Sequence, residues 1–300
     1  MKNIFKYVVF TIVVVFGVTG CSVKNQYDNL ETKTIKEIEA LSDDKKTLGI
    51  AFGGGGVRGF VHLGVIKALE EEGIEADIIT GTSAGSIVAS FYASGMGYDD
   101  MQKIVNELEE GDIQDLTFLS NGGMIQGKKL AHWINEKTKN IKIEDTPKKL
   151  GIAVTDLTNG RALLITKGNI GKASQTSSSI PGGFVPVFSK DKMLVDGGVL
   201  SLVPVDFNRA LGADLVVAID IYCGKLKKPK ENMLNIMYAA TRLQNCKISE
   251  FEMDHADFII RPNYEPKDMG SFDSKLESIQ VGYDAAKKII PALKQRLKEI

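Results

Sequence analysis

The chain has 300 residues and a formal net charge of −1; 43% of the residues are hydrophobic and 25% are charged. This length and hydrophobic content are enough for one sizeable core or two modest ones. The balanced charge provides no basic stripe for a phosphate backbone, which excludes a nucleic-acid-binding protein and leaves no nucleic acid among the expected partners.

The first 20 residues are typical of a secretory signal peptide. Lys2 and Lys6 precede an apolar run of about a dozen residues, which is shorter than the roughly 20 that a membrane-spanning helix needs. Residues 18–21, Val-Thr-Gly-Cys, resemble the lipobox of bacterial lipoproteins. The resemblance implies removal of residues 1–20, lipidation of Cys21, and attachment to a membrane surface of the bacterial cell envelope, on its periplasmic face or at the cell surface. The alternative is an uncleaved anchor with an incidental cysteine.

Residues 21–47 are polar and charged, with one short helix over 34–41 and no apolar pattern that would build a core. They predict a flexible tether that reaches on the order of 30 Å from the membrane to a globular domain. Cys223 and Cys246 remain after lipidation of Cys21. These two cysteines either pair or stay as buried thiols, and two unpaired core cysteines are the simpler interpretation.

The globular domain begins with a strand, a glycine-rich loop and a helix. Residues 48–52 are apolar, residues 53–59 read Gly-Gly-Gly-Gly-Val-Arg-Gly, and apolar residues recur at helical spacing over 60–72. This order is typical of the start of a doubly wound α/β fold. The pattern Gly-x-Gly-x-x-Gly at 54–59 also fits a dinucleotide fingerprint, but no acidic residue ends the next strand to hold a ribose. We therefore expect no nucleotide partner.

The second strand leads into a pattern typical of a nucleophile elbow. Residues 78–80 are apolar or β-branched, residues 81–85 read Gly-Thr-Ser-Ala-Gly, and an apolar helix follows. The glycines permit a sharp turn that lifts the hydroxyl of Ser83 clear of the sheet. The alternative is a glycine-rich helix entry with a capping serine. If both loops follow parallel strands, N–H donors of the glycine loop lie at the same sheet edge as Ser83 and can stabilise an oxyanion.

Together, the two loops resemble those of the patatin-like phospholipases, including the arginine before the last glycine of the first loop and the spacing to the serine. The resemblance implies that Ser83 is a nucleophile. It also implies oxyanion donors, which are the backbone N–H groups of Gly54, Gly55, Gly56 and Ala84. For Arg58 it implies a bracing role in the loop, with a solvated arginine as the alternative. The remaining motif glycines here are Gly59, Gly81 and Gly85.

The middle of the chain contains two amphipathic helices, predicted at 99–110 and 128–138. The apolar, glycine-broken segment between them, at 118–127, is either a mobile cover over a lipid pocket or a plain connection. Residues 151–156 and 161–166 flank an Asn-Gly turn and predict a hairpin.

A second part of the resemblance lies further along the chain. Ser177, Ser178 and Ser179 either cap local backbone or, by resemblance to the family, form a pocket wall. Residues 193–196 predict a strand that ends in Asp-Gly-Gly, which alone is a common turn. In this order it resembles the Asp-Gly-Gly motif of the family, which implies that Asp196 is the catalytic base and that its turn is formed by Gly197 and Gly198.

An aspartate paired directly with a serine needs help, because an unperturbed carboxylate is a poor base for an alcohol. Burial has to raise its pKa, and oxyanion donors have to lower the barrier. The only histidines are His62, His132 and His255. We expect His62 to be a core or surface residue of its helix, and the other two have no catalytic context. A Ser-His-Asp triad is therefore the weaker mechanism.

The last third of the chain adds core but no recognisable chemistry. A strand is predicted within 211–220, a helix at 233–251, an edge strand over 258–262 that the proline at 262 cuts off, and a final amphipathic helix at 274–300 that Pro291 should kink.

We predict a three-layer αβα fold with a mostly parallel central sheet over residues 48–300, with its motifs within 48–210. The resemblance implies a serine lipid acyl hydrolase, of the phospholipase A or lysophospholipase type, that attacks membrane phospholipid or lysophospholipid through a Ser83–Asp196 dyad. No metal-ligand cluster is visible in the sequence, so we expect no metal and no cofactor. The alternatives are a non-catalytic lipid-binding or scaffolding lipoprotein and an acyltransferase that uses the same acyl-enzyme.

Overall fold

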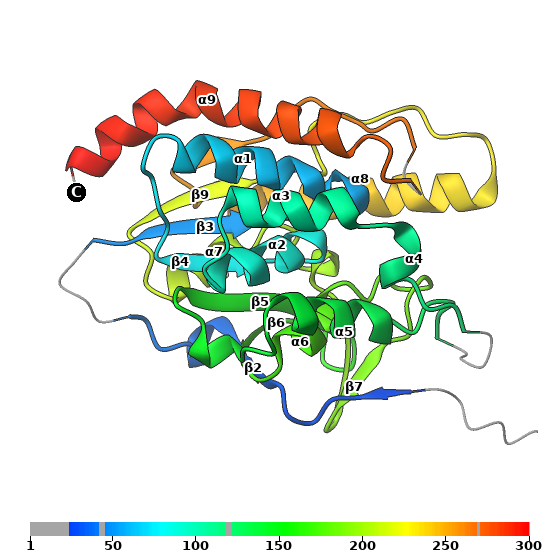
Figure 1. Cartoon of the computed structure of the whole chain (residues 1–300). Helices are drawn as coiled ribbons and strands as arrows, with labels where there is room; N and C mark the ends of the chain where they lie inside the picture. Colours follow the sequence, from blue (N-terminus) through cyan, green and yellow to red (C-terminus); the bar gives the residue numbers. More distant parts are fainter. Residues whose placement is uncertain (1–23, 42–45, 118–121, 269–270, 300) are drawn as a thin grey trace, which may run out of the picture.

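The computed structural model describes residues 24–41, 46–117, 122–268 and 271–299. In these residues, one ten-stranded sheet lies between two layers of helices, which is the predicted three-layer α/β architecture (Figure 1). The strands are β1 (Asn25–Gln26), β2 (Glu31–Lys33), β3 (Leu48–Phe52), β4 (Ile78–Gly81), β5 (Lys149–Asp156), β6 (Arg161–Lys167), β7 (Val187–Ser189), β8 (Lys192–Asp196), β9 (Leu215–Ile219) and β10 (Phe258–Ile260). The α-helices are α1 (Phe60–Glu70), α2 (Ala84–Ala93), α3 (Tyr98–Glu107), α4 (Glu110–Ile113), α5 (Lys128–Lys137), α6 (Ile170–Ser177), α7 (Val205–Ala210), α8 (Met233–Met253) and α9 (Lys275–Glu299).

The middle of the sheet is parallel. β5, β4, β3, β9 and β10 are neighbours in this order, and each adjacent pair is parallel. β6 and β8 both pair with β5 in antiparallel fashion, and the β5–β6 pair is the predicted hairpin. Because parallel neighbours end at the same edge of a sheet, the loops that follow β3 and β4 begin side by side. This topology brings the glycine loop to the serine elbow.

Alternate side chains of the parallel strands face two different cores. Ile50 and Ile79 pack on the side that carries α1, α2 and α9. Ala51 and Val216 face the other side, where Phe207 of α7 is buried. The period-two alternation of a strand therefore explains why both faces of the sheet need a layer of helices.

The close packing of α1 against α9 depends on two glycines. A Cβ atom on Gly64 would lie 1.8 Å from the carbonyl oxygen of Ile279, and one on Gly282 would lie 1.9 Å from the carbonyl oxygen of Val61. Pro291 lies inside α9, which continues to Glu299. Because α1 follows directly on the glycine loop, α9 supports the helix that carries this loop.

The expectation of a flexible tether over residues 21–47 is wrong for residues 24–41. β1 pairs in parallel with β7, and β2 pairs in antiparallel fashion with β6. Tyr27 and Leu30 are buried in the core. Strands of two and three residues are too short to show an alternating pattern, so their backbone pairing with existing strands is what orders this segment.

The predicted signal peptide and Cys21 lie outside the described residues. Among the helices of the described ranges, none combines the length and the apolar character that crossing a bilayer requires.

The expectation of two unpaired cysteines is also wrong, because Cys223 and Cys246 form a disulfide with their Cα atoms 5.6 Å apart. Cys223 follows the carboxyl end of β9, whereas Cys246 lies in the middle of α8. The bond therefore fastens α8 to the sheet edge at which the glycine loop and the serine elbow are found.

Candidate active site

Ser83 lies on a strained turn between β4 and α2. Its φ of 52° and ψ of −125° are unfavourable for a residue that carries a side chain. A Cβ atom on Gly85 would lie 2.2 Å from the carbonyl oxygen of Phe52, and one on Gly81 would lie 2.6 Å from the carbonyl oxygen of Gly85. Only glycine fits at these two positions, and this lets α2 begin directly against β3 and β4. The segment has the geometry of a nucleophile elbow.

Two hydroxyl groups hold the elbow from behind. The backbone N–H of Ser83 donates to Oγ of Ser177 at 2.8 Å, and the Ser177 hydroxyl donates in turn to the carbonyl of Ala153 at 2.6 Å. The hydroxyl of Thr82 donates to the carbonyl of Ser201 at 2.8 Å. Sequence reasoning did not assign this function to Ser177, because its partners lie 94 and 24 residues away along the chain.

Asp196, the last residue of β8, is in contact with Ser83, and both side chains are buried. Its carboxylate accepts hydrogen bonds from the Ser83 hydroxyl and, at 2.7 Å, from the N–H of Gly198. Burial raises the pKa of Asp196 from 3.8 to about 6, against these two hydrogen bonds, which lower it. A Cβ atom on Gly197 would lie 2.4 Å from the carbonyl oxygen of Ala153, so the turn after the aspartate requires glycine there.

The glycine loop lies against the elbow. A Cβ atom on Gly54 would be 3.2 Å from Cβ of Ser83, and one on Gly59 would be 3.0 Å from Cβ of Ala84. Gly56 has a φ of +58°, a conformation that favours glycine. The sequence motif therefore specifies both a sharp turn and the close approach of two loops.

The set of N–H donors differs from the prediction at one position. The N–H of Gly54 donates to the carbonyl of Leu202 at 3.0 Å, so Gly54 is corrected from an oxyanion donor to a residue that anchors the loop. Gly56 and Ala84 begin a 3₁₀-helix and α2, respectively, and the first N–H groups of a helix have no partner within it. Within the described residues, the N–H groups of Gly55, Gly56 and Ala84 have no backbone acceptor.

An apolar cavity of about 290 Å³ opens beside Ser83. Its walls come from α1, α2, α3 and α5, and they include Leu63, Ile87, Val88, Phe91, Met101, Val105, Leu108, Leu130 and Trp133. Ser178 also lines it, with a buried hydroxyl that has no partner in the described part of the chain. Ile125, from the segment at 118–127, forms part of the wall, while residues 118–121 lie outside the described ranges.

The histidines take no part in this arrangement. Nε2 of His62 lies 2.8 Å from the carbonyl oxygen of Gly53, and burial lowers the pKa of His62 to about 4, so the ring is neutral and donates to the loop. Nδ1 of His255 contacts the carboxylate of Asp206. His132 is exposed on α5. No hydrogen bond joins any of the three to Ser83 among the described residues.

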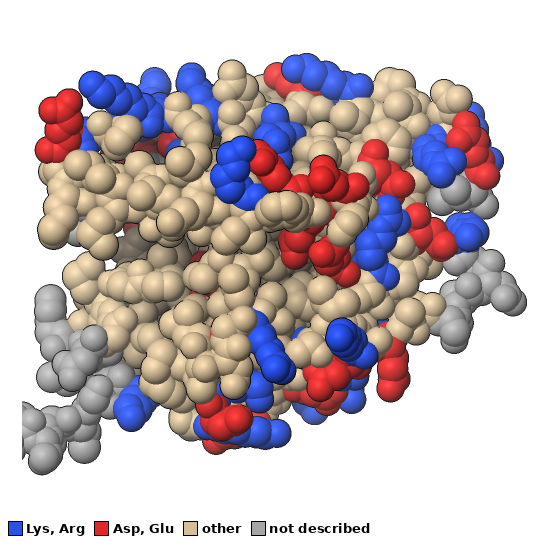
Figure 2. Space-filling model, turned by 180° about the vertical axis from the view of Figure 1, so that it is seen from behind, with Lys and Arg blue, Asp and Glu red and all other residues tan. Residues whose placement is uncertain are grey.

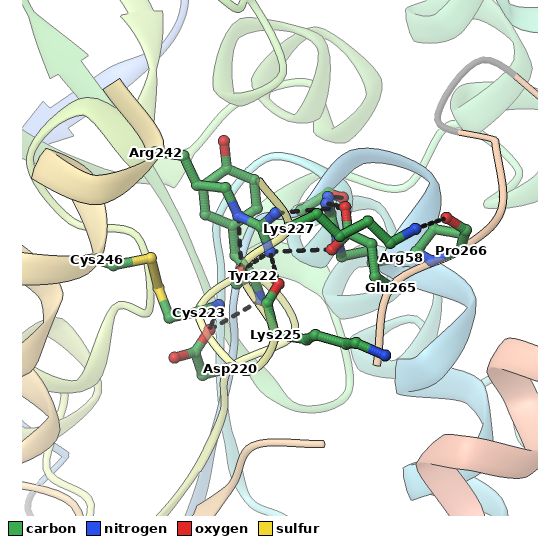
Figure 3. A network of polar contacts seen from close by, with 11 residues as sticks. Arg58, Asp220, Tyr222, Cys223, Lys225, Lys227, Arg242, Cys246, Glu265 and Pro266 are labelled. Carbon is green, nitrogen blue, oxygen red and sulfur yellow. Dashed lines mark hydrogen bonds and ion pairs between the residues drawn. A yellow bond between two sulfur atoms is a disulfide. The ribbon is translucent and has the colours of Figure 1, made fainter. Parts of the chain in front are cut away.

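Arg58 braces the glycine loop from inside the protein (Figure 3). Its side chain is fully buried and donates to the carbonyl of Gly55 at 3.1 Å. It forms two hydrogen bonds with Glu265, at 2.5 and 3.1 Å, and its guanidinium lies over the ring of Tyr222. The bracing interpretation of Arg58 is confirmed, and the solvated one is wrong.

Glu265 also binds a second arginine. Arg242 of α8 donates to the Glu265 carboxylate at 3.1 and 3.3 Å and to the carbonyl groups of Tyr222 and Lys225. The disulfide between Cys223 and Cys246 also holds α8 to the segment after β9 that contains Tyr222 and Lys225 (Figure 3). A continuous set of polar and covalent contacts therefore leads from α8 to the loop carbonyl of Gly55.

Replacing Glu265 by Gln tests this brace. Two buried guanidinium groups would lose their carboxylate, and breaking such a buried pair costs about 3–5 kcal/mol of unfolding free energy. We expect a loss of that order in urea unfolding. Glu231→Gln is the matched control, since its exposed pair with Lys228 contributes little. Equal stability of the two variants would contradict the bracing role.

Comparison with known proteins agrees with this geometry. Residues 50–208, more than half of the chain, match the family model described as patatin-like phospholipase. The chain is 28% identical over 279 residues to patatin-like phospholipase domain-containing protein 7 of Mus musculus, covering 81% of this chain and 20% of the mouse protein. It is 32% identical over 184 residues to lysophospholipase nte1 of Aspergillus fumigatus, covering 59% of this chain and 12% of the fungal protein.

The chain thus spans a small part of the length of these relatives. Among solved structures, VipD from Legionella pneumophila is similar with a TM-score of 0.55 and 18% sequence identity, over 90% of this chain and 71% of VipD. At this identity, the similarity supports the fold alone.

Proposed function

We propose that this chain, which belongs to the patatin-like phospholipase family, is a serine hydrolase. Its proposed substrates are the carboxylic esters of membrane phospholipid or lysophospholipid. The observation that carries the proposal is the buried contact between Ser83 and Asp196 beside an apolar cavity of about 290 Å³. A nucleophile, a base and a site for an acyl chain are thereby found together.

The proposed reaction starts when Oγ of Ser83 attacks the ester carbonyl and Asp196 takes its proton. The N–H groups of Gly55, Gly56 and Ala84 stabilise the negative charge that develops on the carbonyl oxygen. Collapse of the intermediate expels the lipid alcohol, which receives the proton from Asp196. Asp196 then deprotonates a water molecule, which attacks the acyl-serine. The fatty acid is released as Asp196 returns this proton to Oγ of Ser83.

The raised pKa of Asp196 is central to this mechanism. A base with a pKa of about 6 is ionised at neutral pH, yet it is a stronger base than an exposed aspartate. The strained backbone of Ser83 and the hydrogen bond to Ser177 keep the hydroxyl within reach of the carboxylate. No histidine is required.

Ser83→Ala should abolish hydrolysis, and Asp196→Asn should lower kcat by at least about 10²-fold, because a positioned base contributes this much or more. Rates on a soluble short-chain ester and on phospholipid provide the measurement. A fluorophosphonate probe should label the parent protein at Ser83 and leave Ser83→Ala unlabelled. An unlabelled parent protein would favour a non-catalytic lipid-binding function, and acylated alcohol among the products would favour acyl transfer.

The same carboxylate predicts opposite effects of pH on activity and on stability. Activity should fall as the pH drops through about 6, because Asp196 becomes protonated. The pKa of Asp196 is higher in the folded chain than in the unfolded chain. The contribution of this residue to stability is therefore complete below pH 3.8, and it is lost as the pH rises through about 6. This shift corresponds to about 3 kcal/mol.

Asp196→Asn should therefore have strongly reduced activity, yet it should be up to about 3 kcal/mol more stable than the parent above about pH 7. This difference should shrink below about pH 4. Urea unfolding at both pH values measures it. A variant that is less stable than the parent at the higher pH would show that the carboxylate is not destabilised by burial.

We further propose that the mature protein is attached through a lipidated Cys21 to a membrane of the bacterial envelope. The disulfide supports an exported location, because such bonds persist in oxidising compartments. A Cys21→Ala protein should lose acyl incorporation and shift from the membrane to the soluble fraction of the cell. Its retention with membranes, at an unchanged mass, would contradict the lipobox prediction.

A further inference from the structure

α8 has its apolar side turned outward. The side chains that face inward and are buried are Arg242, Cys246, Ser249 and Met253. Large apolar side chains are exposed along the opposite side, and we call them the α8 face: Met233, Ile236, Met237, Leu243, Ile248 and Phe251. With 3.6 residues per turn, these two sets of side chains lie on opposite faces of the helix.

The degree of exposure is unusual for side chains of this type. Phe251 is 76% exposed, Met233 71% and Met237 60%. The helix is held by the disulfide, by the hydrogen bonds of Arg242, by those of Ser201 to Glu252 and by the buried Met253. The exposed apolar residues therefore contribute little to that attachment. Lys247 is exposed between Leu243 and Phe251. Large apolar side chains that are exposed in this number on one helix mark an interaction site.

A basic segment adjoins the α8 face. Residues 225–231 contain four lysines and one acidic residue, Glu231, and all four lysines are exposed. Lys228 is paired with Glu231, and Nζ of Lys227 donates to a backbone carbonyl. The segment therefore has a net positive charge directly before the first exposed apolar residues of α8.

The α8 face lies at the end of the molecule that contains the site. β9 leads at its carboxyl end into the basic segment and then into α8, and Arg242 shares Glu265 with Arg58 of the glycine loop. In Figure 2, a band without charged residues extends along this end of the molecule, with basic and acidic side chains above it and a hollow in the surface below it.

We propose that the α8 face and its basic segment form the surface by which the protein lies on a bilayer that contains anionic lipid. Apolar side chains that enter the acyl boundary, flanked by lysines near the headgroups, are the combination that interfacial helices use. The inference rests on the proposed function, because it would place the site entrance at the source of its substrate.

Anionic headgroups complement the basic segment beside the α8 face, which favours a bilayer as the occupant. A symmetric dimer would instead bring the same face of two copies together. The experiment that follows separates these two outcomes.

Quenching of tryptophan fluorescence by brominated acyl chains tests the contact directly. The full chain carries Ser83→Ala, so that vesicles stay intact, and either Phe251→Trp or the control Leu41→Trp. Leu41 is exposed, and its N–H is bonded to the carbonyl of Leu211 near the opposite end of β9. Trp133 is common to both proteins, and the Ser83→Ala protein without an added tryptophan supplies its contribution.

With vesicles of phosphatidylcholine and phosphatidylglycerol, the added tryptophan at 251 should be quenched and that at 41 should not. Lys228→Glu combined with Lys230→Glu should weaken the quenching in these vesicles. Absence of quenching at 251 would overturn the proposal. So would a dimer, detected by light scattering without vesicles, that Phe251→Glu dissociates.

Enzyme assays separate this proposal from the proposed function. In the active protein, Met237→Glu with Phe251→Glu should reduce hydrolysis of vesicle phospholipid by roughly tenfold or more, because two apolar side chains no longer enter the bilayer. Hydrolysis of a soluble short-chain ester should be unchanged. Equal loss on both substrates would contradict docking, whereas a parent protein inactive on every ester would contradict the proposed function and leave the quenching result standing.

Discussion

The start of α2 lies so close to β3 that a methyl group on Gly85 would overlap the carbonyl oxygen of Phe52. This steric constraint fixes where β4 has to turn, and it forces Ser83 into a conformation with a positive φ. The same turn brings the serine hydroxyl to Asp196 and aligns the first N–H of α2 with the glycine loop. The site is thus a consequence of how tightly three adjacent segments pack.

Two kinds of buried charge surround this turn, and the fold treats them differently. The guanidinium groups of Arg58 and Arg242 share the carboxylate of Glu265, so their charges are paired and hydrogen-bonded. Within the described ranges, Asp196 has only neutral donors, Ser83 and Gly198, and burial raises its pKa. The paired charges stabilise the loop. The carboxylate of Asp196 instead destabilises the fold when it is ionised, and the ionised form is the one that can accept a proton.

What could be predicted from the sequence was local. The strand-loop-helix units and both glycine motifs are contiguous patterns, and the glycines prove to be positions where a side chain would collide. Contacts between distant segments could not be read in this way. Arg58 had two open interpretations because Glu265 is 207 residues away, and the N–H of Gly54 was misassigned because its acceptor, Leu202, comes from another loop.

The helix α8 shows the same limit. Its sequence predicts a helix, but it does not specify which side is turned to the protein. Here a disulfide at Cys246 and the hydrogen bonds of Arg242 select the inner side. The apolar face is left outward at the sheet edge that carries Ser83. The contacts that brace the glycine loop therefore also determine which surface the molecule can offer to a membrane.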